Sequence, residues 1–181
     1  EPKSIEAAKN IVSSNSILEG KIEIRLQEDS KYFFKGIINN DQKFDFSICN
    51  PTFHSSTEEA QKGSHRKVKN LAGKKTVRPE LNFAGLSNEL ICEGGESQFI
   101  HDMISESREF AQNFFWFSTL VSKQSNLKGI YKALNALEVV QIKTIPMGTG
   151  NKSSRIIAWS FLTKEEQKVW REKRWRKSVE L

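Results

Sequence analysis

The stretch FDFSICNPTF, residues 44–53, determines how the rest of this sequence is interpreted. Its first six residues alternate between bulky apolar and small or polar side chains, which predicts a β-strand that ends at Asn50-Pro51. Ligands of open α/β sheets bind at the carboxyl ends of strands, so Asn50, Pro51 and Phe53 lie where a site is expected. The simpler interpretation is a strand that ends in a proline turn, with Asn50 as turn former and Phe53 in the core.

The chemistry of these three residues favours methyl transfer to an exocyclic amine. The amine nitrogen of adenine is a poor nucleophile, because its lone pair is delocalised into the ring. The side-chain oxygen of Asn50 and the backbone carbonyl of Pro51 can accept the amine hydrogens, and Phe53 can stack on the base. Catalysis of this kind comes from positioning and preorganised dipoles.

Composition places the chain among single-domain globular proteins. It has 181 residues, of which 37% are hydrophobic, enough for one core. Cys49 and Cys92 lie in or beside apolar segments, which indicates a reducing compartment and a cytoplasmic protein. No run is long and apolar enough to span a membrane. His54, His65 and His101 share no metal-ligand spacing, so no metal is expected.

The positive charge is concentrated in two runs. The formal net charge of +6 favours an anionic partner, and nucleic acid is the commonest one. Residues 60–79 contain several lysines and arginines and no acid, and a second basic run surrounds Trp170 and Trp175. A solvated face would explain either run alone. Both runs together, beside a motif that can hold a base, favour RNA.

Hydrophobic periodicity and turn residues divide the chain into alternating elements. The predicted helices cover residues 3–15, 30–38, 97–112, 126–137 and 164–177, and the predicted strands cover residues 21–26, 44–49, 114–121, 139–145 and 155–162. This alternation predicts an α/β fold with a mostly parallel sheet and a final antiparallel strand pair. Residues 54–95 have little periodicity and are interpreted as a long basic substrate loop.

Three further positions are candidate phosphate contacts. Lys123 follows a strand on the ligand side, and Lys152 and Arg155 flank a turn near the same rim. A solvated strand end explains Lys123 equally well. The run Glu93-Gly94-Gly95-Glu96 is either a flexible turn with an acid in the first helical turn or a loop beside the target base.

Several ordered blocks of the chain follow one pattern. Besides residues 44–54, they are Arg66-Lys67-x-x-Asn70-Leu71, Leu81-Asn82-Phe83, Glu89-Leu90-x-Cys92-Glu93-Gly94-Gly95-Glu96, Trp116-Phe117-x-x-Leu120-Val121-Ser122-Lys123 and Asn151-Lys152-x-Ser154-Arg155-x-x-Ala158-Trp159-x-Phe161. Together they resemble the bacterial large-subunit (23S) ribosomal RNA adenine-N6 methyltransferase family over most of residues 1–163. That family is similar to other class I methyltransferases, which use S-adenosylmethionine.

The resemblance implies a class I, Rossmann-like methyltransferase sheet, with S-adenosylmethionine as methyl donor and N6 of an adenine in ribosomal RNA as acceptor. It implies catalytic roles for Asn50, Pro51 and Phe53, and contacts of Asn50 and Gln27 with the donor. The candidate RNA contacts are then Arg66, Lys67, Lys69, Lys123, Lys152 and Arg155.

The sequence departs from the family pattern in two respects. Thr52 stands where the family has a second proline, which gives the loop an N–H and more freedom, and we expect this to affect rate. The family's upstream strands and Gly-rich donor loop are not in this sequence. We therefore expect residues 1–163 to be the C-terminal part of a methyltransferase domain that is inactive alone. The missing strands are expected to lie between the strands at residues 21–26 and 44–49. Residues 164–181 are expected to form a basic C-terminal helix.

Two other functions remain open at this point. A degenerate methyltransferase without a donor loop would be a non-catalytic RNA-binding module. A methyltransferase for a protein glutamine uses a similar motif, although the basic surface argues against it.

Overall fold

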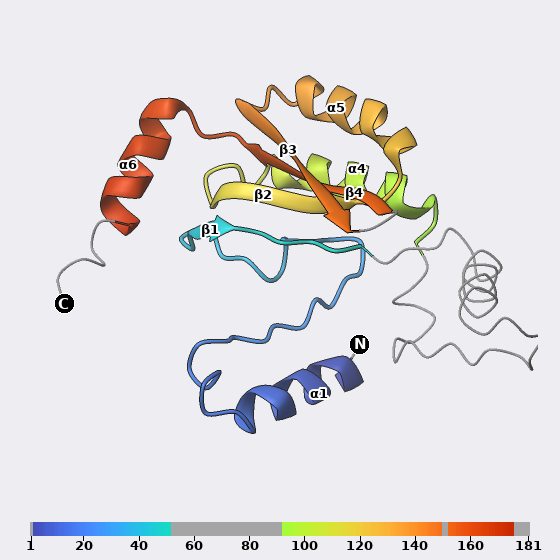
Figure 1. Ribbon diagram of the computed structural model, residues 1–181. Helices are drawn as coiled ribbons and strands as arrows, with labels where there is room; N and C mark the ends of the chain where they lie inside the picture. Colours follow the sequence, from blue (N-terminus) through green and yellow to red (C-terminus); the bar gives the residue numbers. More distant parts are fainter. Residues whose placement is uncertain (1, 52–91, 150–151, 176–181) are drawn as a thin grey trace, which may run out of the picture. The chain divides into compact units, whose positions relative to one another are not determined.

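The computed structural model describes residues 2–51, 92–149 and 152–175, which belong to two compact units (Figure 1). The first unit is Glu1–Gln42 and the second is Lys43–Leu181. The predicted substrate loop, residues 54–95, lies outside the described residues except for its last four positions. None of the described helices is long and apolar enough to cross a membrane.

The first unit contains one helix followed by irregular chain. Helix α1 (Pro2–Ser13) matches the prediction for residues 3–15. After α1, the side chain of Arg25 connects to residues later in this unit. Its guanidinium donates hydrogen bonds to the carbonyl of Ile37 at 2.5 Å and to the side chain of Gln42 at 2.8 Å. An ion pair with Glu23 at 2.7 Å holds the same side chain.

Two elements predicted in this unit do not form. The strand predicted at residues 21–26 is wrong, because a strand needs a hydrogen-bonded neighbour and no described strand pairs with this stretch. The helix predicted at residues 30–38 is also wrong. Gly36 has a φ of 88°, in the left-handed region, which interrupts a right-handed helix and leaves a series of turns.

The second unit is built on a four-stranded sheet. Its strands are β1 (Phe44–Phe46), β2 (Phe114–Val121), β3 (Gln141–Thr149) and β4 (Lys152–Ser160), in the order β1-β2-β4-β3. Strands β1 and β2 are parallel, while β4 is antiparallel to both β2 and β3. The antiparallel terminal pair is therefore confirmed, whereas a mostly parallel sheet is wrong for the described strands.

The core lies where the helices α4 (Gly95–Ser107) and α5 (Leu127–Ala136) pack beside this sheet (Figure 1). A short 3-10 helix, η1 (Gln124–Asn126), leads into α5. Ile100, Met103 and Ile104 of α4 are almost completely buried. On the sheet, the rings of Phe117 and Trp159 stack with centroids 5.7 Å apart. The sequence predicted both helices, but α4 ends at Ser107 and turns replace its last predicted residues.

The last described element is α6 (Lys164–Arg174). A capping box starts it: Thr163 accepts from the backbone N–H of Glu166 at 3.2 Å, and Glu166 accepts from the backbone N–H of Thr163 at 2.7 Å. Asp45 of β1 accepts hydrogen bonds from the indoles of Trp170 at 2.8 Å and Trp175 at 2.9 Å. The predicted helix over 164–177 is thus confirmed as far as Arg174.

Candidate active site

The residues Asn50 and Pro51 follow directly on the last backbone contact between β1 and β2. Although β1 ends at Phe46, the chain continues beside β2, because the N–H of Cys49 donates to the carbonyl of Ser118 at 3.1 Å. The N–H of Leu120 donates to the carbonyl of Cys49 at 2.9 Å. Asn50 is exposed and Pro51 is partly buried. The predicted strand over residues 44–49 is thus regular only as far as Phe46, and Asn50 follows an isolated pairing of Cys49 with Thr119.

Cys49, the residue before Asn50, is partly buried. Burial raises the pKa of its thiol, against the opposing effect of a hydrogen bond with Thr119. The raised pKa favours the protonated thiol, which is typical of a small apolar side chain.

The buried carboxylate of Glu96 holds the carboxyl end of β2 at the same edge of the sheet. It accepts from the backbone N–H groups of Ser122 at 2.7 Å and Lys123 at 3.1 Å. It also accepts from the side-chain amide of Asn126 at 2.6 Å. Glu96 is only 5% exposed. The N-terminus of α4 is thereby tied to the strand that pairs with the Asn50 segment.

Two glycines make the sharp entry into α4. Gly94 and Gly95 have φ values of 77° and 64°, which side chains rarely allow. A Cβ on Gly94 would lie 2.5 Å from the Cβ of Gln98. Of the two interpretations of the Glu93–Glu96 run, the described contacts give Glu96 a structural role at the site edge. Sequence reasoning missed its link to Ser122 and Lys123, because no local pattern signals a contact 26 residues away.

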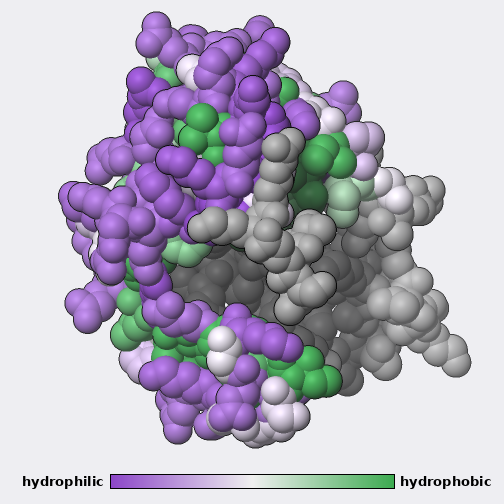
Figure 2. Space-filling model, turned by 90° about the vertical axis from the view of Figure 1, so that its left-hand side faces the viewer, coloured by the Kyte–Doolittle hydropathy of each residue, from purple (hydrophilic) through white to green (hydrophobic). Residues whose placement is uncertain are grey.

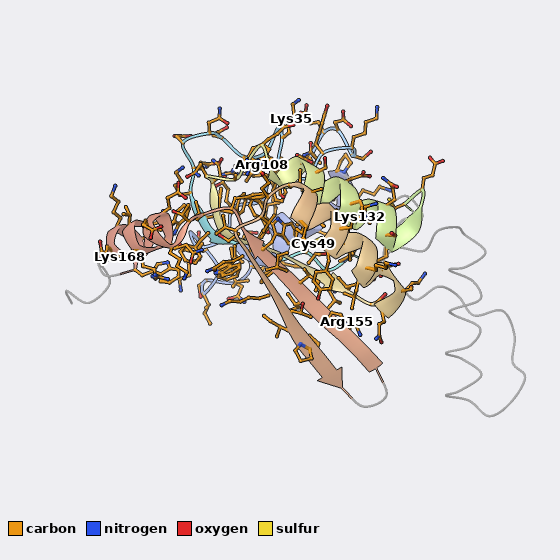
Figure 3. All side chains as sticks on the ribbon, turned by 90° about the horizontal axis from the view of Figure 1, so that it is seen from above. Lys35, Cys49, Arg108, Lys132, Arg155 and Lys168 are labelled. Atoms are coloured by element: carbon orange, nitrogen blue, oxygen red, sulfur yellow. The ribbon has the colours of Figure 1, made fainter. Side chains whose placement is uncertain are left out.

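The predicted phosphate contacts differ in how far their side chains are exposed to solvent. Lys123 is exposed at the end of β2. Arg155 is only 8% exposed, and its backbone pairs with Val121 and Pro146 within the sheet. Figure 3 shows Arg155 on the β3–β4 hairpin. Little of Arg155 is open to solvent, and its contact with a phosphate stays a prediction. Lys152 begins β4, and its side chain lies outside the described ones.

The remaining predicted site residues fall elsewhere. Gln27 belongs to the first unit, where its amide donates to the carbonyl of Lys35 at 2.9 Å and accepts from the N–H of Asp29 at 3.2 Å. Phe53, Arg66, Lys67 and Lys69, together with Thr52, lie outside the described residues. Within the described ranges, no group of three or more His, Cys, Asp or Glu residues could hold a metal ion.

Several curated proteins with similar sequences are named as ribosomal RNA methyltransferases. The chain is 52% identical over 176 residues to the ribosomal RNA large subunit methyltransferase F of Cytophaga hutchinsonii, covering 97% of this chain and 55% of that protein. It is 49% identical over 188 residues to the protein of the same name from Photobacterium profundum, covering 95% and 56%. The chain thus spans about half the length of the curated relatives it matches.

Solved structures with a similar fold are methyltransferase domains. The hMettl16 catalytic domain in complex with MAT2A 3′UTR hairpin 1 matches with a TM-score of 0.66 and 22% identity, over 88% of this chain and 53% of that one. The N-terminal domain of human METTL16 in complex with SAH matches with a TM-score of 0.60 and 19% identity, over 88% and 48%. At these identities the likeness concerns the fold, which is that of class I methyltransferases.

The family match covers most of the chain. It extends from the first helix through the β3–β4 hairpin and includes the Asn50 segment, the Glu96 contact and the strand that this contact holds. Because residues 1–163 match the family described as RNA methyltransferase, the chain belongs to that family.

Proposed function

We propose that the protein containing this chain methylates N6 of an adenine in large-subunit ribosomal RNA, with S-adenosylmethionine as the methyl donor. The observation that carries this proposal is the exposed amide of Asn50 at the carboxyl end of the β1 segment, directly before Pro51. The names of the bacterial relatives support ribosomal RNA as the substrate. The net charge of +6 is consistent with a polyanionic partner.

In the proposed mechanism the chain positions the amine and supplies no strong base. The Asn50 side-chain oxygen and the Pro51 carbonyl accept the two amine hydrogens, which turns the nitrogen lone pair toward the donor. Phe53 stacks on the adenine after the base has left its stack. When bound, S-adenosylmethionine supplies a methyl group on a positively charged sulfur. If the amine took up this methyl group, the sulfur would become neutral and the amine would release one proton to solvent water.

The described residues fit the methyl donor in part. Asn50 offers an exposed amide at the edge where donors of this fold class are held. Gln27 is the second proposed donor contact, but its amide is engaged with Lys35 and Asp29. A role of Gln27 therefore requires these two loop contacts to give way.

The proposed RNA contacts are cations around the same edge. Lys123 carries this part of the proposal best, because Glu96 fixes its backbone while its side chain is exposed. Lys152 and the run Arg66, Lys67 and Lys69 are further proposed phosphate contacts.

The test of the reaction is the substitution Asn50→Ala in the full-length protein. Loss of an acceptor used in the transition state is expected to lower turnover about 100-fold or more, while RNA affinity stays nearly unchanged. Turnover is measured by mass mapping of N6-methyladenine in 23S ribosomal RNA from cells that lack the gene and carry the variant. Asn135→Ala, at an exposed position on α5, is the matched control and should methylate normally.

Each alternative has its own outcome in this experiment. Normal turnover of Asn50→Ala would remove the catalytic assignment. RNA binding by the unsubstituted protein without any adenine methylation would favour the non-catalytic module. Methylated glutamine in a protein partner, with unmodified RNA, would favour a protein glutamine methyltransferase.

A further inference from the structure

A cavity of about 730 Å³ lies at the other end of β2 from Asn50. Its walls come from the start of β2, the start of β3 and one side of α6, and they include Phe115, Trp116, Lys143, Gln167, Arg171 and Trp175. Trp116 lies opposite Phe46 in the sheet, whereas Cys49 lies opposite Thr119. From Trp116 to Val121 at the carboxyl edge is about 16 Å, at about 3.3 Å per strand residue. The cavity is therefore separate from the candidate active site.

The aromatic wall of this cavity is held in place before any ligand arrives. The rings of Phe115 and Trp175 lie with centroids 4.9 Å apart. The indole N–H of Trp175 donates to Asp45 at 2.9 Å, which fixes the ring's orientation although Trp175 is 43% exposed. Trp116 is half-buried beside them. Indole rings that are partly open to solvent can serve as stacking platforms for nucleobases.

Two cations stand over these rings. The ammonium of Lys143 lies 4.8 Å from the ring centre of Trp116, and the guanidinium of Arg171 lies 5.9 Å from that of Phe115. Both side chains are exposed. None of the described residues that line the cavity is acidic. An anionic group next to a flat ring is thus the ligand chemistry that complements both walls.

A pair of amides completes the lining. The Gln167 amide is 5% exposed and donates to the side chain of Gln141 at 3.2 Å and to the carbonyl of Leu162 at 2.9 Å. These bonds hold the two glutamine side chains in a fixed arrangement beside the rings. Figure 2, which views the side on which α6 lies, shows hydrophobic patches set among hydrophilic residues.

We propose that this cavity binds an unpaired nucleotide of single-stranded RNA. The base stacks against Trp116 and Trp175, and the flanking phosphates contact Lys143 and Arg171. The inference rests on the proposed function in one respect, that RNA is the substrate. It adds that the RNA is held at a second place, remote from the adenine that is methylated.

The test uses the full-length protein and an oligouridylate, which contains no adenine and so cannot serve as methyl acceptor. Affinity is measured by fluorescence anisotropy of the labelled oligonucleotide. The double variant Lys143→Gln/Arg171→Gln is expected to weaken binding about tenfold or more, because it removes both phosphate contacts. The double variant Lys132→Gln/Lys168→Gln removes the same charge from exposed positions on α5 and α6 outside the cavity, and should change affinity less than about twofold. Figure 3 labels both control lysines.

A second measurement does not depend on the variants. Photocrosslinking with 4-thiouridine, followed by peptide mass mapping, should place the crosslink on the β2 or α6 peptide that contains Trp116 or Trp175. Equal weakening by the two double variants, or crosslinks elsewhere only, would overturn the proposal. Competition by an oligoglutamate peptide as effective as by the oligonucleotide would also overturn it, and would make an acidic peptide the ligand.

The experiment separates this proposal from the proposed function. Asn50→Ala should bind the oligouridylate as the unsubstituted protein does. Oligouridylate binding that depends on Lys143 and Arg171, in a protein that methylates no ribosomal adenine, would support the cavity while removing the reaction. If the protein methylates a ribosomal adenine but Lys143→Gln/Arg171→Gln binds the oligouridylate normally, the reaction would be supported and the cavity proposal would be overturned.

Discussion

At the scale of single residues, Glu96 shows how a buried charge can organise an edge of the sheet. A carboxylate removed from water is costly unless hydrogen bonds replace its hydration. Here two backbone N–H groups and the Asn126 amide replace it. Because the donors belong to the chain just after β2, the side chain fixes the point at which Lys123 leaves the sheet. The candidate active site thus depends on a residue that need not touch the substrate.

The prediction at this scale concerns Glu96→Gln. The amide keeps the shape of the side chain but turns an N–H₂ group toward N–H donors, so at least one buried hydrogen bond is lost. The expected cost is about 1–3 kcal/mol of unfolding free energy. It is measured by urea denaturation of the variant and the unsubstituted protein.

The matched control is Glu93→Gln, which makes the same exchange at an exposed position three residues earlier. Its unfolding free energy should stay within about 0.5 kcal/mol of the original. Equal stability of the two variants would contradict a structural role of Glu96.

At the scale of elements, α6 is joined to β1 through one carboxylate. Asp45 accepts from Trp170, Trp175 and Arg174, the last at 3.3 Å. Partial burial by itself would raise the pKa of Asp45, but these hydrogen bonds outweigh burial and lower it. The folded state therefore binds the Asp45 proton more weakly than the unfolded state does.

This pKa direction predicts an acid-sensitive docking of α6. A carboxyl with a lowered folded pKa stabilises the fold above its ordinary value of about 4, and the contribution is lost as pH falls through the folded pKa. Asp45→Asn should lower the melting temperature at pH 7, and the difference from the unsubstituted protein should shrink below about pH 4. The shift is expected to be modest, because the side chain is 37% exposed and solvent screens it.

Tryptophan fluorescence during thermal melts at several pH values measures this difference. Asp41→Asn, at an exposed position, is the control and should leave the melting curve unchanged at every pH. A melting difference for Asp45→Asn that stays constant from pH 7 to pH 3 would contradict the assignment.

The elements also show where sequence patterns are sufficient. The apolar run of β2 was predicted with its observed bounds, because a buried strand bounded by polar residues carries its own signal. The stretch at residues 21–26 has the alternation of a strand, but alternation cannot supply a partner. The β3–β4 hairpin extends further toward its turn than predicted, because its outer residues pair with one another and not with the core.

Among the site residues, too, local signals could be predicted from the sequence, whereas long-range pairing could not. The sequence predicted that pairing with the sheet stops at Asn50, because that signal is local and lies in the dipeptide Asn50-Pro51 itself. Arg155 was expected beside a turn near the rim, but its burial depends on the register that pairs it with Val121. That register is a long-range property, and neither residue's neighbours in sequence reveal it.

At the scale of the whole molecule, the proposed functions lie at opposite ends of one strand. The parallel pair of β1 and β2 carries Asn50 and Lys123 at its carboxyl end, while Trp116 and the cavity lie near the amino end. An RNA strand bound at both places would run along the sheet. Its affinity would then depend on phosphate contacts spread over the protein, with a strong dependence on salt.

The last prediction tests the carboxyl end of that path. For single strands, each neutralised phosphate contributes about −0.7 to the slope of log affinity against log salt concentration. Lys123→Ala in the full-length protein should therefore make that slope shallower by about 0.7 for a 23S ribosomal RNA fragment, with about equal weakening for different sequences. Lys132→Ala, on α5, is the control and should leave the slope unchanged. An unchanged slope for Lys123→Ala would mean that this lysine is solvated and contacts no phosphate. RNA bound at the carboxyl edge would then have to contact the other proposed cations.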